Sequence, residues 1–162
     1  MYTKIKCFLI HNGFKKAEFL RKNKVFGSMG NKCFYHPRKL PSEPHRVFFG
    51  NNVVIATDVY FCTHDISNVV LNQKYAAGGG MQFEWTVGNI VVEDNVFIGA
   101  NSSIRYGVTI GHDSIIAMGS VVVKDVPSNS VVGGNPARLI CSFGEYVKKL
   151  SDRQKRGMAY GR

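Results

Sequence analysis

Apolar residues recur at every sixth position along two stretches of this chain. Residues 92–127 divide without a gap into VEDNVF, IGANSS, IRYGVT, IGHDSI, IAMGSV and VVKDVP, and residues 49–64 contain FGNNVV, IATDVY and FCTH in the same frame. The first position is apolar in all nine units, and the fourth is Asn, Asp or Gly in eight, with His64 as the exception. A period of six is neither the 3.6-residue repeat of an amphipathic helix nor the two-residue alternation of a half-buried strand.

A six-residue unit suits a short strand followed by a corner, with three strands completing one triangular turn of a solenoid. The apolar residue then points inward and stacks on its equivalent one turn away, about 4.7–4.9 Å along the axis. Gly, Asn and Asp tolerate the left-handed backbone angles that such a corner requires. A sandwich with evenly spaced turns is the alternative, but its strands alternate with a period of two and its loops vary in length. The pattern therefore predicts an all-β solenoid, a parallel β-helix.

The flanking segments extend this prediction toward the N-terminus. We expect a β-helix over residues 29–140 within a single domain of residues 1–162. The units MGNKCF and YHPRKL resemble degenerate repeats, and a break follows at Pro41–Pro44. Residues 1–28 are a basic, weakly patterned lead-in, with a helix expected near Phe14–Lys22.

A final α-helix is expected over residues 142–153. Its start, Ser142-x-x-Glu145, matches a capping box, in which the two side chains satisfy backbone N–H groups of the first turn. Apolar residues share one face at helical spacing; they are Phe143, Tyr146, Val147 and Leu150. The last ten residues or so are expected to fray.

The interruption of the repeat is a second informative feature. The pattern stops after His64 and resumes at Val92, and the interval from Phe61 to Val92 is not a multiple of six. Residues 65–89 must therefore leave the solenoid and return, and loops of this length in a regular fold are usually functional. We expect an extended loop with a flexible tip at Gly78–Gly80. His64 would stand at its base, on a corner stacked with two later corners; these are Gly107 and Asp125.

Composition narrows the class of protein. No apolar run approaches the roughly 20 residues that span a bilayer, and the first ten residues make a poor signal peptide. The four cysteines lack CxxC spacing, so neither a disulfide framework nor a zinc site is expected. These features favour a cytoplasmic location.

The net charge of +10 is concentrated at the two ends of the chain. Residues 1–40 hold ten basic and one acidic side chain, residues 148–162 hold six and one, and the part between holds five and nine. A uniformly basic surface and an interleaving of basic and aromatic residues are both absent from the sequence, so a nucleic-acid partner is not indicated. The basic ends are either solvated or help to hold an anionic cofactor.

The stretch TVGNIVVEDNVFIGANSSIRYGVTIGHDSIIAMGSVVVKDVPSNSVVGGNPARLI resembles the hexapeptide-repeat acetyltransferases. The similarity is to the galactoside/maltose and xenobiotic acetyltransferase branch, covers roughly residues 47–140, and is most specific in VVKDVP and VVGGNPAR. This resemblance implies left-handed coiling, a homotrimer, and acetyl-CoA lying in the groove between neighbouring subunits. It also implies one essential histidine where the extended loop begins, and His64 in FCTHD occupies that place.

His64 suits the chemistry that the resemblance implies. Moving an acetyl group from a thioester to a hydroxyl needs a base for the hydroxyl proton, and imidazole has an ordinary pKa near 6.5. A backbone N–H near the groove would stabilise the oxyanion. Taken alone, a histidine at a corner is more often structural, because histidine tolerates left-handed angles.

The other candidates for chemistry are weaker. A metal-binding β-helix of the γ-carbonic-anhydrase type uses a close histidine pair, whereas no two histidines here lie closer than nine residues in sequence. We therefore expect no metal. Cys62 follows the inward Phe61, which favours a small wall residue over a thiol nucleophile.

For the cofactor, the resemblance implies contacts from residues of the last coils. Lys124 and Arg138 would meet phosphate groups, although a solvated corner lysine is the alternative for Lys124. The family often has a smaller residue at the position of Met118 and a threonine at that of Val123. Phe97 matches a position that can flank the cofactor. The expected cofactor-binding residues are Ala100, Met118, Val123, Lys124 and Arg138.

The acceptor is the least determined part. Sugar sites favour carboxylates, amides and an aromatic platform, which makes Asp65 and Trp85 the expected acceptor contacts, with Asn72 and Glu84 also in the loop. Any of the four can instead be a loop-packing or exposed residue. The sequence thus predicts an acetyl-CoA-dependent O-acetyltransferase acting on a sugar or polysaccharide hydroxyl. A xenobiotic O-acetyltransferase and a non-catalytic β-helix scaffold, which would need neither His64 nor the loop, are the alternatives.

Overall fold

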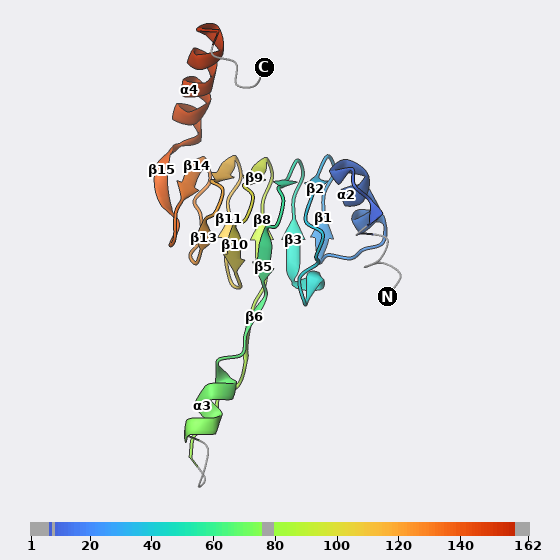
Figure 1. Ribbon diagram of the computed structural model, residues 1–162, viewed down its shortest axis with the longest axis vertical. Helices are drawn as coiled ribbons and strands as arrows, with labels where there is room; N and C mark the ends of the chain where they lie inside the picture. Colours follow the sequence, from blue (N-terminus) through green and yellow to red (C-terminus); the bar gives the residue numbers. More distant parts are fainter. Residues whose placement is uncertain (1–6, 8, 76–79, 158–162) are drawn as a thin grey trace.

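Short parallel strands stack into three sheets along one axis, as the six-residue pattern predicts. The structure is a computed structural model and describes residues 7, 9–75 and 80–157. Figure 1 shows a row of coils with helix α2 at one end, helix α4 at the other, and an arm that carries helix α3 away from the middle of the row. Successive strands pass from one sheet to the next, so that three faces are formed.

Each face has its own set of strands, which we name here. The first face contains β1 (Ser28–Met29), β3 (Val47–Phe49), β8 (Ile90–Val92) and β11 (Thr109–Ile110). The second face contains β5 (Tyr60–Cys62), β10 (Ser103–Arg105) and β13 (Val121–Val122). The third face contains β2 (Phe34–Tyr35), β4 (Val54–Ile55), β9 (Val96–Ile98), β12 (Ser114–Ile116), β14 (Ser130–Gly133) and β15 (Arg138–Ser142).

The stacking register confirms the predicted core. Ile104 of β10 pairs with Val122 of β13, three repeat units further along the chain, and with Phe61 of β5 on its other side. The apolar first residue of every one of the nine units is buried. Burying one such side chain stabilises the fold by about 1.5–3 kcal/mol. The core is therefore a set of apolar stacks along the axis.

The predicted left-handed backbone conformation at the fourth position is confirmed in seven of the nine units. A positive φ occurs at Asn52, Asp58, Asn95, Asn101, Gly107, Asp113 and Gly119. The expectation was wrong for Asp125 and His64, which do not have one. Asp125 makes its corner with its side chain, whose carboxylate accepts a hydrogen bond from the backbone N–H of Thr109 (2.8 Å). His64 lies in strand β6 (His64–Asp65), which pairs antiparallel with β7 (Thr86–Val87) and begins the arm.

The first full coil is slightly longer than the regular ones. Regular partners, such as Ile104 and Val122, are three whole units apart, whereas Ser28 pairs with Phe48, two positions beyond that spacing. The excess lies between β2 and β3, where residues 36–46 replace a strand of the second face with an irregular segment and the 3-10 helix η1 (Pro44–Arg46). Tyr35, the first residue of the degenerate unit YHPRKL, is buried as expected, and Pro41 at the start of the break is buried as well.

Helix α2 (Gly13–Lys22) lies where a helix was predicted and covers the N-terminal end of the stack. It buries Ala17 and Leu20 against the first coil. The Nζ of Lys16 is also buried and donates hydrogen bonds to the carbonyls of His36 (3.2 Å) and Pro37 (3.3 Å). Desolvation lowers the pKa of Lys16. Most of the basic lead-in before this helix lies outside the described residues.

The C-terminal end differs from a further coil. Strand β15 turns back and pairs antiparallel with β14, so the coil pattern ends before residue 140. Helix α4 (Phe143–Lys155) follows, with the predicted capping box formed by Ser142 and Glu145. None of its residues is buried, and the helix projects beyond the coils (Figure 1). Residues 158–162, where fraying was expected, lie outside the described part.

The predicted extended loop forms an arm, which we define as the described residues between His64 and Gly88. Strands β6 and β7 form its stem, and helix α3 (Asn68–Tyr75) lies beyond them (Figure 1). Gly88 donates its N–H to the carbonyl of Thr63 (3.1 Å), which closes the base. Gly78 and Gly79 of the expected tip lie outside the described residues. No helix in the described part of the chain is long and apolar enough to cross a membrane.

Candidate active site at the base of the arm

His64 lies where the arm leaves the second face, and a carboxylate contacts its ring. Nδ1 of His64 is 2.8 Å from Oε2 of Glu43, and the hydroxyl of Thr63 donates a hydrogen bond to the same oxygen. The side chains of His64 and Glu43 are 25% and 20% exposed, while Thr63 is buried. The pair is therefore partly shielded but open on one side.

The contact with Glu43 determines which ring nitrogen carries the proton. An ionised carboxylate only accepts hydrogen bonds, so Nδ1 of His64 must be the donor. In the neutral ring the other nitrogen, Nε2, then holds a bare lone pair. His64 is thus arranged to accept a proton at Nε2.

Glu43 is held in its ionised form. The hydrogen bond from Thr63 lowers the pKa of Glu43 most, followed by the bond from His64 and the charges of His64 and Arg46. Glu43 precedes η1, yet its side chain makes no capping bond to that helix. Its carboxylate is directed to Thr63 and His64 instead.

Trp85, an expected acceptor contact, lies beside His64. The two ring centroids are 5.5 Å apart with the planes tilted by 49°, and Trp85 is 51% exposed. An exposed indole face next to a proton acceptor can serve as a stacking platform for a sugar ring. The structure therefore brings these two predicted residues together.

Asp65 also lies at this site, but one carboxylate oxygen is engaged in the arm. Ser67 donates its backbone N–H to Asp65 Oδ1 (2.7 Å), and this bond lowers the pKa of Asp65. Asn72, another loop candidate, exchanges hydrogen bonds with the backbone N–H and carbonyl of Phe83 (2.7 and 2.8 Å). Asn72 is thus a packing residue of the arm.

Two of the predicted cofactor residues line a groove beside α4. Ala100 and Met118 lie on neighbouring coils, and Met118 is 74% exposed. The groove has a volume of about 560 Å³, and Phe97 lines it as well. Its walls are mostly apolar, with Lys149 and Arg153 contributing cationic groups. Such a surface suits a flexible arm with an anionic end.

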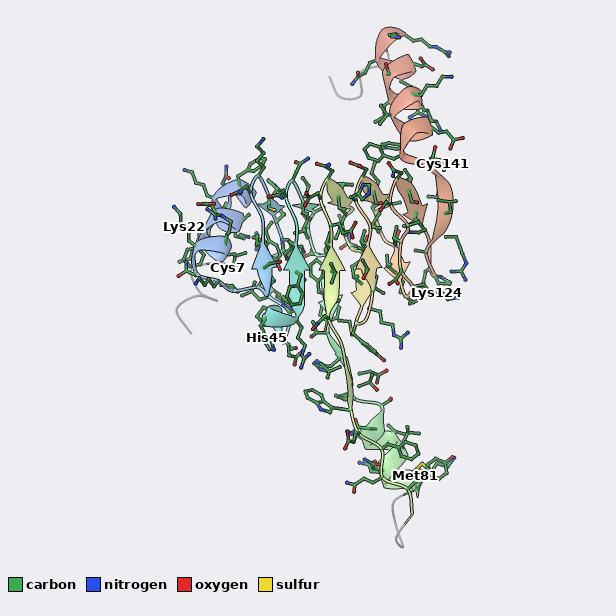
Figure 2. All side chains as sticks on the ribbon, turned by 180° about the vertical axis from the view of Figure 1, so that it is seen from behind. Cys7, Lys22, His45, Met81, Lys124 and Cys141 are labelled. Carbon is green, nitrogen blue, oxygen red and sulfur yellow. The ribbon has the colours of Figure 1, made fainter. Side chains whose placement is uncertain are left out.

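The remaining predicted cofactor residues line a separate hollow near the last coil. Val123, Lys124 and Arg138 border a volume of about 320 Å³. Figure 2 shows Lys124 at the opposite end of the coils from Cys7. Lys124 and Arg138 are exposed, and their charges are available to phosphate groups.

Four of the predicted residues fall on two edges of the second face, whereas Arg138 lies in β15 of the third face. His64 and Lys124 follow β5 and β13, at the edge where the chain passes to the first face. Ala100 and Met118 precede β10 and β13, at the opposite edge. In one chain the two sets are separated by the length of a strand of this face.

Sequence reasoning missed Glu43 and Thr63. Glu43 lies in the irregular Pro41–Pro44 segment, where the repeat frame gives no position to an individual side chain. The sequence did contain a sign of this segment. Phe49 continues the six-residue repeat of Met29 and Tyr35, but it lies two positions later than whole repeat units would place it. This small excess, in the coil just before the candidate histidine, marks a departure from the repeat close to the site.

The other candidates have structural surroundings. His112 is bonded through Nδ1 to its neighbour Asp113 (2.8 Å), and Nδ1 of His36 is 2.7 Å from the hydroxyl of Thr57. Cys62 is half-buried, and its thiol lies 3.2 Å from the carbonyl of His64. Within the described ranges, no three His, Cys, Asp or Glu side chains group as a metal site would require.

Known proteins are similar to this chain in sequence. A family model described as the hexapeptide repeat of succinyl-transferase matches residues 89–124. Protein CapG of Staphylococcus aureus is 39% identical over 125 residues, which are 75% of this chain and 69% of that protein. Galactoside O-acetyltransferase of Escherichia coli is 36% identical over 114 residues, which cover 70% of this chain and 49% of the relative.

A solved structure extends the likeness to the fold. The hexapeptide-repeat acetyltransferase VCA0836 of Vibrio cholerae, complexed with acetyl-CoA, is 27% identical with a TM-score of 0.58, covering 88% of this chain and 84% of that one. The chain spans about half the length of the galactoside enzyme and just over two thirds of CapG. Repeat frame, parallel coils and relatives agree, and the chain belongs to the hexapeptide-repeat acetyltransferases, a family of acyltransferases.

Proposed function

We propose that this protein transfers the acetyl group of acetyl-CoA to a hydroxyl of a sugar or polysaccharide unit, with His64 as the general base. The observation that carries the proposal is the bare Nε2 of His64, which stands at the base of the arm beside the exposed ring of Trp85. The galactoside O-acetyltransferase among the relatives supports the reaction class and a carbohydrate acceptor. Two further expectations are part of the same proposal: left-handed coiling, which the family resemblance implies, and cytoplasmic action, which the composition of the sequence favours.

The proposed chemistry needs one proton acceptor and no covalent enzyme intermediate. Acetyl-CoA supplies the acetyl group as a thioester. Nε2 of His64 takes the proton of the acceptor hydroxyl as its oxygen bonds to the thioester carbon. The imidazolium then returns that proton to the departing sulfur, so the ring is neutral again at the end of the cycle.

The residues expected to hold coenzyme A fit its parts. The groove of Ala100 and Met118 is apolar, as a pantetheine arm requires, and the hollow of Val123 presents two cations through Lys124 and Arg138. Phosphate groups favour arginine and lysine in this way.

A homotrimer would unite the two edges. In a closed ring of identical subunits, one edge of a chain meets the opposite edge of its neighbour. His64 of one subunit could then face Ala100 and Met118 of the next. The arm supports this assembly, because several of its large apolar side chains are exposed; they are Ile66, Val69, Val70, Tyr75, Met81 and Trp85. Figure 2 shows Met81 on the arm, away from the coils.

The test combines an acceptor screen with one substitution. Purified protein, acetyl-CoA and a panel of neutral, amino and acidic sugars, with antibiotic hydroxyls as a second panel, are followed by the released thiol. The variant His64→Asn keeps a polar side chain and loses the base, so kcat should fall by about 10²–10⁴. The mass measured in solution and the affinity for acetyl-CoA should stay unchanged.

Three results would each refute a part of the proposal. Full activity of His64→Asn on an accepted sugar would remove the general base from the mechanism. A stable monomer at micromolar concentration with normal turnover would remove the groove shared between subunits. Preference for antibiotic hydroxyls over every sugar would move the acceptor to the xenobiotic class.

A further inference from the structure

One oxygen of Glu43 accepts two hydrogen bonds, and both come from the strand end that carries His64. Oε2 of Glu43 accepts from the Thr63 hydroxyl and from Nδ1–H of the imidazole. Thr63 is buried, so its hydroxyl needs a partner within the protein. The carboxylate is therefore fixed from one side while it contacts the ring from the other.

The chain departs from its repeat at the place that supplies this carboxylate. The excess of the first coil lies within residues 36–46, and Glu43 lies in that segment. A regular coil would place a strand of the second face here, in line with β5. Instead the chain forms η1, and the backbone carbonyl of Glu43 accepts from the N–H of Arg46 (3.0 Å) while the side chain of Glu43 reaches the coil of His64.

From this geometry we propose that Glu43 is a positioning residue for the acyl transfer. It acts through His64, held in place by Thr63. The inference rests on the proposed role of His64 as general base. Glu43 fixes the tautomer with the proton on Nδ1, which leaves Nε2 free for the acceptor hydroxyl. It also stabilises the imidazolium that forms when that proton arrives, because the carboxylate and the charged ring then make a charge-assisted hydrogen bond.

Among the described residues, few charged groups lie near the ring, which makes the effect of Glu43 separable. The segment before β3 supplies Glu43 and Arg46, strand β6 supplies Asp65, and the neighbouring strand β10 supplies Arg105. Strand β7 is preceded by the uncharged ring of Trp85. Glu43 is the anion in direct hydrogen-bond contact with the ring, whereas Asp65 bonds to Ser67.

The main test is Glu43→Gln. Glutamine can still accept from Nδ1–H through its amide oxygen, so the ring orientation survives while the negative charge is lost. A hydrogen bond to a charged group is stronger than a neutral one by an amount equal to about a tenfold change in rate. We expect kcat to fall about tenfold with the KM for acetyl-CoA unchanged. The acid limb of the pH–rate profile should move to lower pH, because a neutral partner no longer favours the protonated ring.

Three further variants separate charge from packing. Thr63→Val removes the hydroxyl at nearly constant volume and should reproduce part of the loss, whereas Thr63→Ser keeps the hydroxyl and should stay near wild type. Glu18→Gln in α2 is the matched control: Glu18 is a surface carboxylate paired with Arg21 and Lys22, and its loss should leave activity unchanged.

A readout without turnover completes the design. With ¹⁵N-labelled histidine, the ring-nitrogen shifts of His64 in the full-length protein should report a proton on Nδ1, assigned by comparison with His64→Asn. In Glu43→Ala that preference should be lost. This measurement stands even if a variant is too inactive for kinetics.

The outcomes distinguish this inference from the proposed function. If Glu43→Gln keeps the wild-type kcat and acid limb while His64→Asn is inactive, Glu43 is not a positioning residue and the general base remains. A proton on Nε2 in the wild-type protein would also overturn the inference. If His64→Asn is fully active, the proposed function itself is wrong.

Discussion

Substituting Gly99 by alanine tests how closely the coils approach at the candidate cofactor groove. Gly99 lies between β9 and Ala100, and a Cβ built on it would be 2.5 Å from the backbone N of Met118 and 2.8 Å from the carbonyl O of Ile116. Both are backbone atoms of the next coil, which cannot rotate away. Ordinary contact needs about 3.5 Å, so the coils must separate by roughly 1 Å.

The magnitude follows from the hydrogen bonds at that corner. Gly99 donates to the carbonyl of Ile116 (2.9 Å), and Gly119 donates to that of Ala100 (2.8 Å). A stretch of about 1 Å takes both beyond the normal hydrogen-bond range. Two bonds at about 1 kcal/mol each, with a similar term for overpacking, give a destabilisation of about 3 kcal/mol. For a domain of this size that corresponds to a fall in Tm of about 6–12 °C.

Gly119 provides the matched control, because a side chain at this position is limited by the backbone conformation and not by the space around it. A Cβ on Gly119 would meet nothing within 4 Å, but its φ is +69°. Alanine there should cost about 1 kcal/mol. Asparagine tolerates this backbone better, so Gly119→Asn should be more stable than Gly119→Ala, as the asparagine corners elsewhere in the chain suggest. At Gly99 the order should be reversed, with asparagine worse than alanine.

Thermal unfolding followed by circular dichroism measures all four variants at one protein concentration, since the midpoint of an oligomer depends on concentration. Calorimetry with coenzyme A on the same samples should show weaker binding for Gly99→Ala, whose corner carries Ala100 and Met118. Wild-type stability of Gly99→Ala, or an asparagine more stable than alanine at position 99, would refute the close-approach argument.

Three other outcomes follow from the geometry. Lys124→Ala should weaken coenzyme A binding more at low than at high ionic strength, since exposed charges are screened by salt. If calorimetry shows an equal loss of affinity at every ionic strength, Lys124 is a solvent-exposed residue without a role in cofactor binding. The pKa of Glu43 is lowered in the folded protein, so ionised Glu43 stabilises the fold above its unfolded pKa of about 4.3, and this stabilisation is lost as the pH falls through the lower folded pKa. The Tm difference between wild type and Glu43→Gln should therefore shrink below about pH 4. A Tm difference that stays constant down to about pH 2 would contradict this. Ser142→Ala removes the α4 cap, so helical circular dichroism should fall while Ser142→Asp retains it.

The periodic part of the fold could be predicted from sequence because each position has one role. An apolar residue every sixth position specifies the inward stack, and its register follows from three units per turn. The corners were predictable at Asn101 and Gly107 because their residue types tolerate positive φ. The prediction of a positive φ at Asp125 was wrong because this carboxylate stabilises the corner by accepting a hydrogen bond from the backbone of the preceding coil.

The candidate site was predictable only in part. The repeat frame marks His64 as the fourth-position exception, and the loop that follows marks it as a site. The contact with Trp85 could not be derived, because it depends on how the two arm strands pair across an insertion without a repeat. Glu43 was missed for the same reason: it lies in the segment with the two additional residues, where the repeat no longer predicts which way a side chain points. Non-periodic segments carry their information in three-dimensional contacts, which pattern counting does not reach.

These departures from the repeat are physically connected. In a stack of coils joined by parallel strand pairing, each coil fixes the register of the next. Additional residues can therefore be accommodated only where a strand is absent or at a corner between two strands. The excess of the first coil gives up a strand of the second face beside β5, and the insertion opens the corner directly after β5. They lie on adjacent coils at the same side of the molecule, and the hydrogen bond between Glu43 and His64 joins them. A stack that tolerates change at so few places brings its irregular segments together, which is why the side chains of Glu43, Thr63 and His64 meet there.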